Sequence, residues 1–189
     1  VEITFQPIDW AMKETELASG NIDMIWNGYT ITEERKEKVL FSEPYLSNSQ
    51  IIVTMADSDI ETKADLAGKV VATQQGSAAF DAIIADETGI AAEFDGGTPI
   101  LYPTFNDVFN DLESGRSDAI VVDEVLGRYT MKLKGEEKFA VLTDNFGDEE
   151  YGVGLRKEDV ALKEAIDATM NDMREDGTYD EIYAKWFAE

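Results

Sequence analysis

One arginine of this chain stands in the first turn of a charged helix, which is electrostatically unusual. In the stretch IWNGYTITEERKEK (residues 25–38), Arg35 follows the helix-capping residue Thr32 by three positions. The unpaired N–H groups at a helix start carry about half a positive charge, so acidic side chains and bound anions are favoured there. A cation close to the polar residues Asn27 and Thr30 therefore indicates either a solvated charged face or an arginine that binds an anion.

An internal repeat places an acidic residue at the matching position in the second half. The segments LASGNIDMI (17–25) and LESGRSDAI (112–120) share Leu, Ser-Gly, Asp and Ile at an offset of 95 residues. The same offset aligns Gly28 with Asp123. A ligand held by Arg35 and Asp123 should carry both charges, as a free α-amino acid does with its carboxylate and ammonium. Asp123 is equally well explained as a simple N-terminal cap of the helix that follows it.

Small and polar residues near these two charges suit ligand binding. Gly28 lets the backbone approach a ligand closely. The stretch TQQGSAAF (73–80) puts Gly76 and Ser77 at a strand-to-helix junction, where successive N–H groups can hold a carboxylate. This signal is weak because the lysine and the spacing of a P-loop are lacking, and Ser77 is as good a helix cap as a ligand-binding residue. Trp10 stands at a similar junction, where a core aromatic is the plainer alternative.

The repeat also predicts the elements that position these residues. Each copy reads as a strand, an amphipathic helix ending at glycine and a short apolar strand, opened by EITFQP (2–7) and GTPILYP (97–103). Such units are right-handed and parallel, so we expect an α/β protein with two lobes. Strand KVVATQ (69–74) and helix 78–87 precede the second copy only. The first lobe is therefore expected to be shortened at its N-terminus, with a naturally smaller lobe as the alternative.

The end of the chain reads as two helices separated by Gly177. The second of them has an apolar face formed by Tyr179, Ile182, Tyr183 and Trp186. We expect these side chains in the core rather than in a ligand site.

The composition excludes several classes of function. The 189 residues are 43% hydrophobic, which suits a globular chain of one large domain or two small lobes. The net charge of −24 argues against nucleic acid and anionic membrane surfaces as partners, and it favours a soluble monomer. Cysteine and histidine are absent, which removes thiolate metal sites and the usual nucleophile–base pairs. We therefore expect no cofactor, no metal and no catalytic residues.

Three motifs together resemble the bacterial solute-binding proteins of polar amino acid ABC transporters (family 3). GNIDMIWNGYTITEERKEKVLFSEPY resembles the family signature around an arginine, SDAIVVD its acidic motif and REDGTYDEIYAKWF its C-terminal helix pair. The resemblance covers essentially the whole chain. It implies a type II periplasmic binding protein-like fold, with two Rossmann-like lobes joined by crossing strands near 43–50 and 144–152. Lobe 1 would be residues 1–48 with 150–189, and lobe 2 residues 49–149.

The resemblance also implies a role for each site residue. The residues expected at the ligand carboxylate are Arg35, Thr30, Ser77 and Ala78. Those expected at the ligand ammonium are Asp123 and the Gly28 carbonyl, and those expected around the ligand side chain are Trp10, Asn27 and Gln74. The family usually has threonine where this chain has Ala78, so only the backbone N–H of Ala78 can contribute.

The function implied is that of an ABC importer's substrate-binding component, not an enzyme. It would capture a polar L-amino acid between its lobes and deliver it to a membrane permease. An extracellular or periplasmic location follows, with a lipid anchor through a preceding segment as one option. An amino-acid sensor domain and a dehydratase-like enzyme on the same scaffold are the alternatives. In the family a strand and a helix precede the point where this chain begins. We therefore expect a monomer with weakened or absent ligand binding, unless another chain fills the gap.

Overall fold

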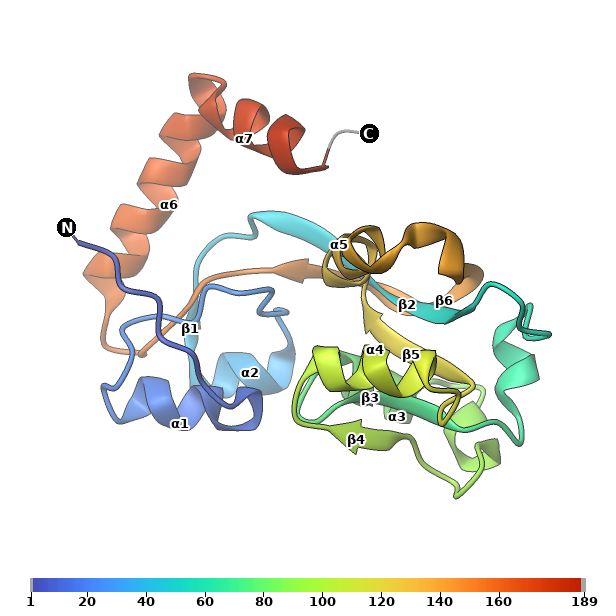
Figure 1. The fold of residues 1–189 in the computed structure, drawn as a ribbon. Helices are drawn as coiled ribbons and strands as arrows, with labels where there is room; N and C mark the ends of the chain where they lie inside the picture. The colour runs from blue at the N-terminus through green and yellow to red at the C-terminus, as the bar shows by residue number, and fades with distance from the viewer. Residues whose placement is uncertain (1, 188–189) are drawn as a thin grey trace. The chain divides into compact units, whose positions relative to one another are not determined.

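The α/β chain falls into two compact units (Figure 1). The computed structural model describes residues 2–187. Unit 1 contains Ser47–Glu149 with the described residues of Val1–Lys13, and unit 2 contains the described residues of Glu14–Leu46 and Glu150–Glu189. Two of the junctions between units fall inside the long strands β2 (Leu46–Met55) and β6 (Phe139–Tyr151). The exact lobe limits expected from the sequence stay a prediction.

Unit 1 is built on a five-stranded mixed sheet in the order β4-β3-β5-β2-β6. Strand β3 (Val71–Gln74) is parallel to both β4 (Ile100–Tyr102) and β5 (Ala119–Asp123). Helix α4 (Phe105–Glu113) connects β4 to β5, so the second repeat copy forms the parallel strand–helix–strand unit expected from its pattern. Strand β2 runs antiparallel to β5.

Both faces of this sheet are buried, because successive residues of β5 enter two different cores. Ala119 and Val121 pack with Ile83 of α3 (Ala78–Ala85) in one apolar cluster. Ile120 packs with Phe109 of α4 in the other cluster, which also contains Met131 of α5 (Glu124–Lys134). Helices therefore cover the sheet on both sides, as the uninterrupted apolar run of β5 requires. Short 3-10 helices complete the unit: η1 (Trp10–Met12), η2 (Lys63–Leu66), η3 (Ile90–Glu93) and η4 (Glu136–Lys138).

Unit 2 is mainly helical around a small sheet. Its elements are α1 (Lys13–Ala18), which begins at the last residue grouped with unit 1, α2 (Glu33–Lys38), β1 (Leu40–Phe41), β7 (Gly154–Leu155), α6 (Val160–Glu175) and α7 (Thr178–Phe187). Strands β1 and β7 pair antiparallel. Isolated bridges join Ile25 to Gly154 and Thr30 to Tyr151. A Cβ at Gly154 would lie 2.6 Å from the Tyr29 ring, so this glycine allows the ring to pack against the backbone.

The two copies of the internal repeat make equivalent backbone hydrogen bonds. At the end of α1, the N–H of Gly20 donates to the Leu17 carbonyl and that of Asn21 to the Glu16 carbonyl. At the end of α4, the corresponding donors Gly115 and Arg116 bond to Leu112 and Asp111. Gly20 and Gly115 have φ values of 77° and 70°. Both helices therefore end in the same left-handed glycine turn, which supports the repeat as a structural unit.

The expected strand EITFQP is wrong. Residues 2–9 contain no helix or strand. Ile3 and Phe5 are 76% and 91% exposed. Alternating apolar residues satisfy the pattern of a strand, but a strand also needs a neighbour for its backbone hydrogen bonds, and no described strand pairs with this segment.

The core placement expected for the last helix is also wrong. Helix α7 contains no buried residue, and Tyr183 and Trp186 are 46% and 63% exposed. Its aromatic residues contact one another instead: Tyr183 stacks on Tyr179 and lies 5.1 Å from Phe187 between ring centroids. Amphipathic spacing predicted the apolar face correctly but not whether another element covers it.

Candidate functional site

Arg35 is a buried cation in unit 2. Its side chain is 4% exposed, and its Nη1 donates to the Thr30 carbonyl at 3.0 Å. The guanidinium carbon lies 4.8 Å from the centroid of the Tyr29 ring, a cation–π distance. The Thr32 hydroxyl accepts from the Arg35 N–H and caps α2, as expected. The solvated-face reading of Arg35 is therefore wrong.

The tyrosine that supports Arg35 is fixed from several sides. Tyr29 is fully buried, stacks on Phe41 and donates its hydroxyl proton to Glu14 at 3.0 Å. Burial and the neighbouring Glu14 carboxylate raise the pKa of Tyr29 well above its usual range. The ring therefore stays neutral and presents a fixed face to the guanidinium.

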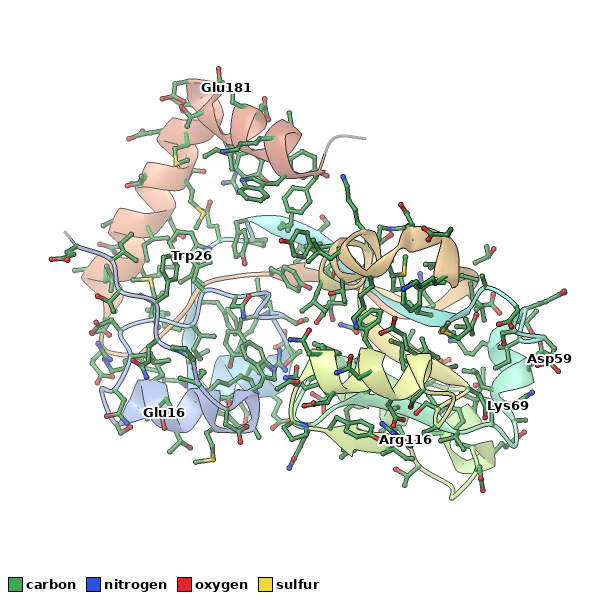
Figure 2. All side chains as sticks on the ribbon, in the orientation of Figure 1. Glu16, Trp26, Asp59, Lys69, Arg116 and Glu181 are labelled. Atoms are coloured by element: carbon green, nitrogen blue, oxygen red, sulfur yellow. The ribbon has the colours of Figure 1, made fainter. Side chains whose placement is uncertain are left out.

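An aromatic group borders the Gly28 turn. Gly28 has φ 57°, and a Cβ there would meet the Tyr151 ring at 3.3 Å. Burial raises the pKa of Tyr45 to about 12, although a hydrogen bond with the Gly28 backbone opposes the rise. The Trp26 ring lies edge-on to Tyr45, with centroids 6.1 Å apart, and is 51% exposed. Figure 2 labels Trp26. Asn27, which lies between Trp26 and Gly28 in the sequence, is exposed.

Asp123 is a buried carboxylate at the end of β5 in unit 1. It is 9% exposed, and its Oδ1 accepts from Gln50 Nε2 at 2.7 Å and from Asn48 Nδ2 at 3.1 Å. The same two amides donate to Glu149 Oε1 at 2.8 and 2.7 Å. Two carboxylates are thus joined through two buried amides.

Asp123 stands at the N-cap position of α5, but its side chain does not supply the cap. Asp123 precedes α5 but makes no side-chain hydrogen bond to the helix N-terminus. The Asn48 side-chain oxygen accepts from the Val125 N–H instead, at 3.2 Å. The neighbouring strand therefore supplies the cap, and the Asp123 carboxylate is directed to the amide pair.

The Gly76–Ser77 turn opens α3 in unit 1. The Ser77 hydroxyl accepts from the Phe80 N–H and donates to the Gln74 carbonyl at 2.7 Å, so it caps this helix. Gln74 is 9% exposed and donates from Nε2 to the Pro103 carbonyl at 2.9 Å. Ala78 is buried at the first position of the helix. Among the expected site residues of unit 1, the structure thus brings Gln74, Ser77 and Ala78 together.

Trp10 is half-buried and begins η1. Its ring centroid lies 5.1 Å from the Lys13 ammonium. At half burial, Trp10 is not one of the fully buried core residues, and the core alternative and the ligand-binding role both stay open.

Asn48, Gln50, Glu149 and Lys13 are not among the residues expected from the sequence. A usable signal existed for the first two, because Asn48 and Gln50 stand at alternate positions of a strand and therefore share one face, although the serines beside them are polar too. Glu149 and Lys13 carry no such signal, since both lie in segments rich in charged residues.

Residues 2–187 offer neither a metal site nor a membrane-spanning helix. No group of three or more His, Cys, Asp or Glu side chains in that range is arranged to hold a metal ion. Nor does any helix there combine the length and apolar character that crossing a membrane requires.

Comparison with known proteins shows which family this sequence matches. The sequence model of the family described as "Bacterial extracellular solute-binding proteins, family 3" matches residues 1–189. The L-cystine-binding protein TcyJ of Escherichia coli (strain K12) is 33% identical over 189 residues, which are 99% of this chain and 68% of that protein.

Two solved structures are also similar. A substrate binding protein of an ABC uptake transporter from Streptococcus pneumoniae, with bound histidine, has a TM-score of 0.95 and 37% identity. The match covers 100% of this chain and 77% of that one. An ancestral amino acid-binding protein, AncCDT-1, described as a precursor of cyclohexadienyl dehydratase, has a TM-score of 0.82 and 33% identity. That match covers 99% of this chain and 78% of that one.

Proposed function

The chain belongs to the bacterial extracellular solute-binding proteins, family 3, and on that premise we propose that it captures a polar L-amino acid for an ABC importer. Its fold is the type II periplasmic binding protein fold of its structural neighbours. In this proposal the two lobes close on the amino acid, and a membrane permease then receives it. Relatives named for cystine and crystallised with histidine support the class of ligand.

One observation carries the proposal: Arg35 of unit 2 and Asp123 of unit 1 are buried groups of opposite charge, and each lies beyond the end of one copy of the repeat. Arg35 is 4% exposed and Asp123 is 9% exposed. Hydrogen bonds hold both groups at fixed positions, and a free α-amino acid carries the two complementary charges. A guanidinium can bind the α-carboxylate through two parallel hydrogen bonds, while a carboxylate accepts from the α-ammonium.

Other residues of the proposed site act around these charges. Thr30 supports the guanidinium, and Ala78 offers its backbone N–H at the helix start, where N–H groups have no partner inside the helix. Gly28 offers its carbonyl to the ammonium. Trp10, Asn27 and Gln74 are proposed to lie around the ligand side chain.

The test is calorimetric titration with L-histidine, L-cystine, L-glutamine, L-arginine and L-glutamate, with D-glucose as the negative control. The proposal requires saturable binding of at least one amino acid, whereas the sequence alone led us to expect weakened or absent binding, and this titration decides between the two. D123N should weaken it by about tenfold or more, because the hydrogen bonds of an ammonium to a charged acceptor are worth roughly 1.5–3 kcal/mol. D57N removes the same charge from an exposed turn of unit 1 and should leave the affinity unchanged. Equal affinities for D123N and D57N would rule out the assigned role of Asp123.

Binding without turnover is part of the proposal. AncCDT-1 links this fold to a dehydratase lineage, so prephenate is the informative substrate. We expect no dehydration of prephenate, since the sequence contains no histidine or cysteine and the acidic centre holds its carboxylates on neutral amides. Turnover that D123N abolishes would favour the enzyme instead.

We further propose that the protein works as a monomer outside the cytoplasmic membrane, the location that the family description gives. This proposal includes a lipid anchor on a preceding segment, which would hold the protein at the membrane. Light scattering would test the monomer, and metabolic labelling with a fatty acid in the source cells would test the anchor.

A further inference from the structure

A lysine is buried beside the Gly76–Ser77 turn of unit 1. Lys13 is 4% exposed. Its ammonium donates to the Gly76 carbonyl at 3.0 Å and to the Trp10 carbonyl at 3.3 Å. Lysine is almost never buried unless its ammonium is hydrogen-bonded or paired, because desolvating the charge is costly. Two backbone carbonyls and the face of the Trp10 ring, 5.1 Å away, supply part of that environment.

The turn is built to accept this contact. Gly76 has φ 68°, and a Cβ there would lie 3.3 Å from the Ala11 Cα and 3.8 Å from Lys13 Nζ. Only glycine combines this left-handed backbone with so close an approach. The segment around Ala11 and Lys13 therefore packs directly against the backbone of the turn.

The Gly76 carbonyl belongs to the same peptide group as the Ser77 N–H. Because a peptide group is planar, a bond that fixes its carbonyl also fixes the direction of its N–H. The next peptide carries the N–H of Ala78, the first residue of α3. A charged donor on the Gly76 carbonyl thus controls the orientation of the backbone that starts this helix.

We propose that Lys13 is a positioning residue for carboxylate recognition: it holds the Gly76–Ser77 peptide so that the start of α3 presents its N–H groups to the ligand carboxylate. The inference rests on the proposed function and adds to it a residue on the Trp10–Lys13 segment. Lys13 acts through the turn and is not assigned a contact with the ligand.

Two substitutions separate hydrogen bonding from packing. K13M keeps the length and apolar stem of the side chain but removes the ammonium. K13R keeps a charged donor and adds bulk. If Lys13 orients the Gly76 carbonyl, K13M weakens amino-acid binding by about tenfold, the worth of one charge-assisted hydrogen bond, and K13R restores most of it. If Lys13 only fills space, K13M binds normally and K13R loses affinity.

The measurement is calorimetric titration with L-histidine, L-glutamine and L-arginine. Thermal unfolding of each variant without ligand gives its stability. K132M is the matched control, because Lys132 is exposed on α5 of the same unit and its loss changes the net charge equally. Binding by K13M equal to K132M, or loss in K13M that K13R does not restore, would overturn the inference while leaving the proposed function intact. Absence of amino-acid binding by the unsubstituted chain would instead overturn the proposed function, and this inference with it.

Discussion

At the scale of single residues, Arg35 is held in a geometry that a lysine cannot reproduce. Its planar guanidinium lies against the Tyr29 ring and donates to the Thr30 carbonyl. A guanidinium can make these contacts and still present two parallel donors, whereas an ammonium is a compact point charge on a flexible stem. Keeping the positive charge is therefore not enough to keep the site.

We predict that R35K weakens amino-acid binding by about a hundredfold, because a bidentate contact and the stacking on Tyr29 are both lost. Titration calorimetry gives the change in affinity. K36R exchanges the same two residue types on the exposed side of α2 and should bind like the unsubstituted chain. Similar affinities for R35K and K36R would remove Arg35 from the site.

Gly28 combines two constraints that a matched pair of variants can separate. It has φ 57° and lacks room for a Cβ beside Tyr151, whereas Gly20 has φ 77° and nothing within 4 Å of the added atom. G20A should cost about 1–2 kcal/mol of unfolding free energy from backbone strain alone. G28A should cost about 1 kcal/mol more, because the Tyr151 ring must also shift. Urea unfolding of both variants measures the difference. Equal losses of unfolding free energy would show that the contact with the Tyr151 ring adds no cost.

At the scale of elements, the two copies of the repeat share a hydrogen bond but differ in its burial. Asp111 is fully buried and accepts from Arg116 Nε at 2.5 Å and from the Ser117 hydroxyl. The corresponding pair is Glu16 and Asn21, with Asn21 donating to Glu16 at 2.8 Å on the surface. Figure 2 labels Arg116 and Glu16, one from each copy.

We predict that D111A destabilises the protein by about 3 kcal/mol, because it leaves the buried Ser117 hydroxyl without its acceptor and removes the ion pair with Arg116. E16A removes the equivalent exposed bond and should cost less than about 1 kcal/mol. Urea unfolding followed by circular dichroism measures both. A cost for E16A as large as that for D111A would show that burial does not set the difference.

The same carboxylate predicts a dependence on pH. Burial raises the pKa of Asp111, but hydrogen bonds from Ser117, Tyr102 and Arg116 outweigh it and leave the pKa below its usual value. A lowered pKa means that the native state binds the proton less readily than the unfolded state does. The stabilisation is therefore present above the unfolded-state pKa of about 3.9 and is lost as pH falls through the lower native pKa. The difference in unfolding free energy between the unsubstituted chain and D111N should therefore become smaller as the pH falls below the unfolded-state pKa.

How far the sequence predicted these elements depended on whether the signal was local. Helix caps such as Thr32 and the glycine turns at Gly20 and Gly115 are local, and they were predicted correctly. Strand pairing is not local, because it depends on a distant segment. The alternation of apolar residues in EITFQP therefore could not show whether a partner strand exists. The contacts of Asp123 with Asn48 and Gln50 depend on the register of β2 against β5. That register is set by the pairing of two distant segments, so neither segment alone predicts these contacts. The site residues themselves stay a prediction until binding is measured.

At the scale of the whole molecule, the net charge of −24 should oppose folding through self-repulsion. We predict that the thermal midpoint rises by several degrees when NaCl is raised from about 10 mM to about 150 mM, as the screening length falls from about 30 Å to about 8 Å. The rise should level off at higher salt. Differential scanning calorimetry tests this, and a midpoint that is constant or falls over the low-salt range would contradict it.

The order of the two units along the chain has a consequence for the time course of folding. Ser47–Glu149 is continuous in sequence, whereas unit 2 is assembled from segments about a hundred residues apart, joined by pairs such as Leu40 with Leu155. Contacts over such separations form late, and chains emerging from a ribosome fold as their segments become available. The sheet of unit 1 can therefore form while Glu14–Leu46 still waits for its partner strand, so the half that carries Arg35 matures last during synthesis.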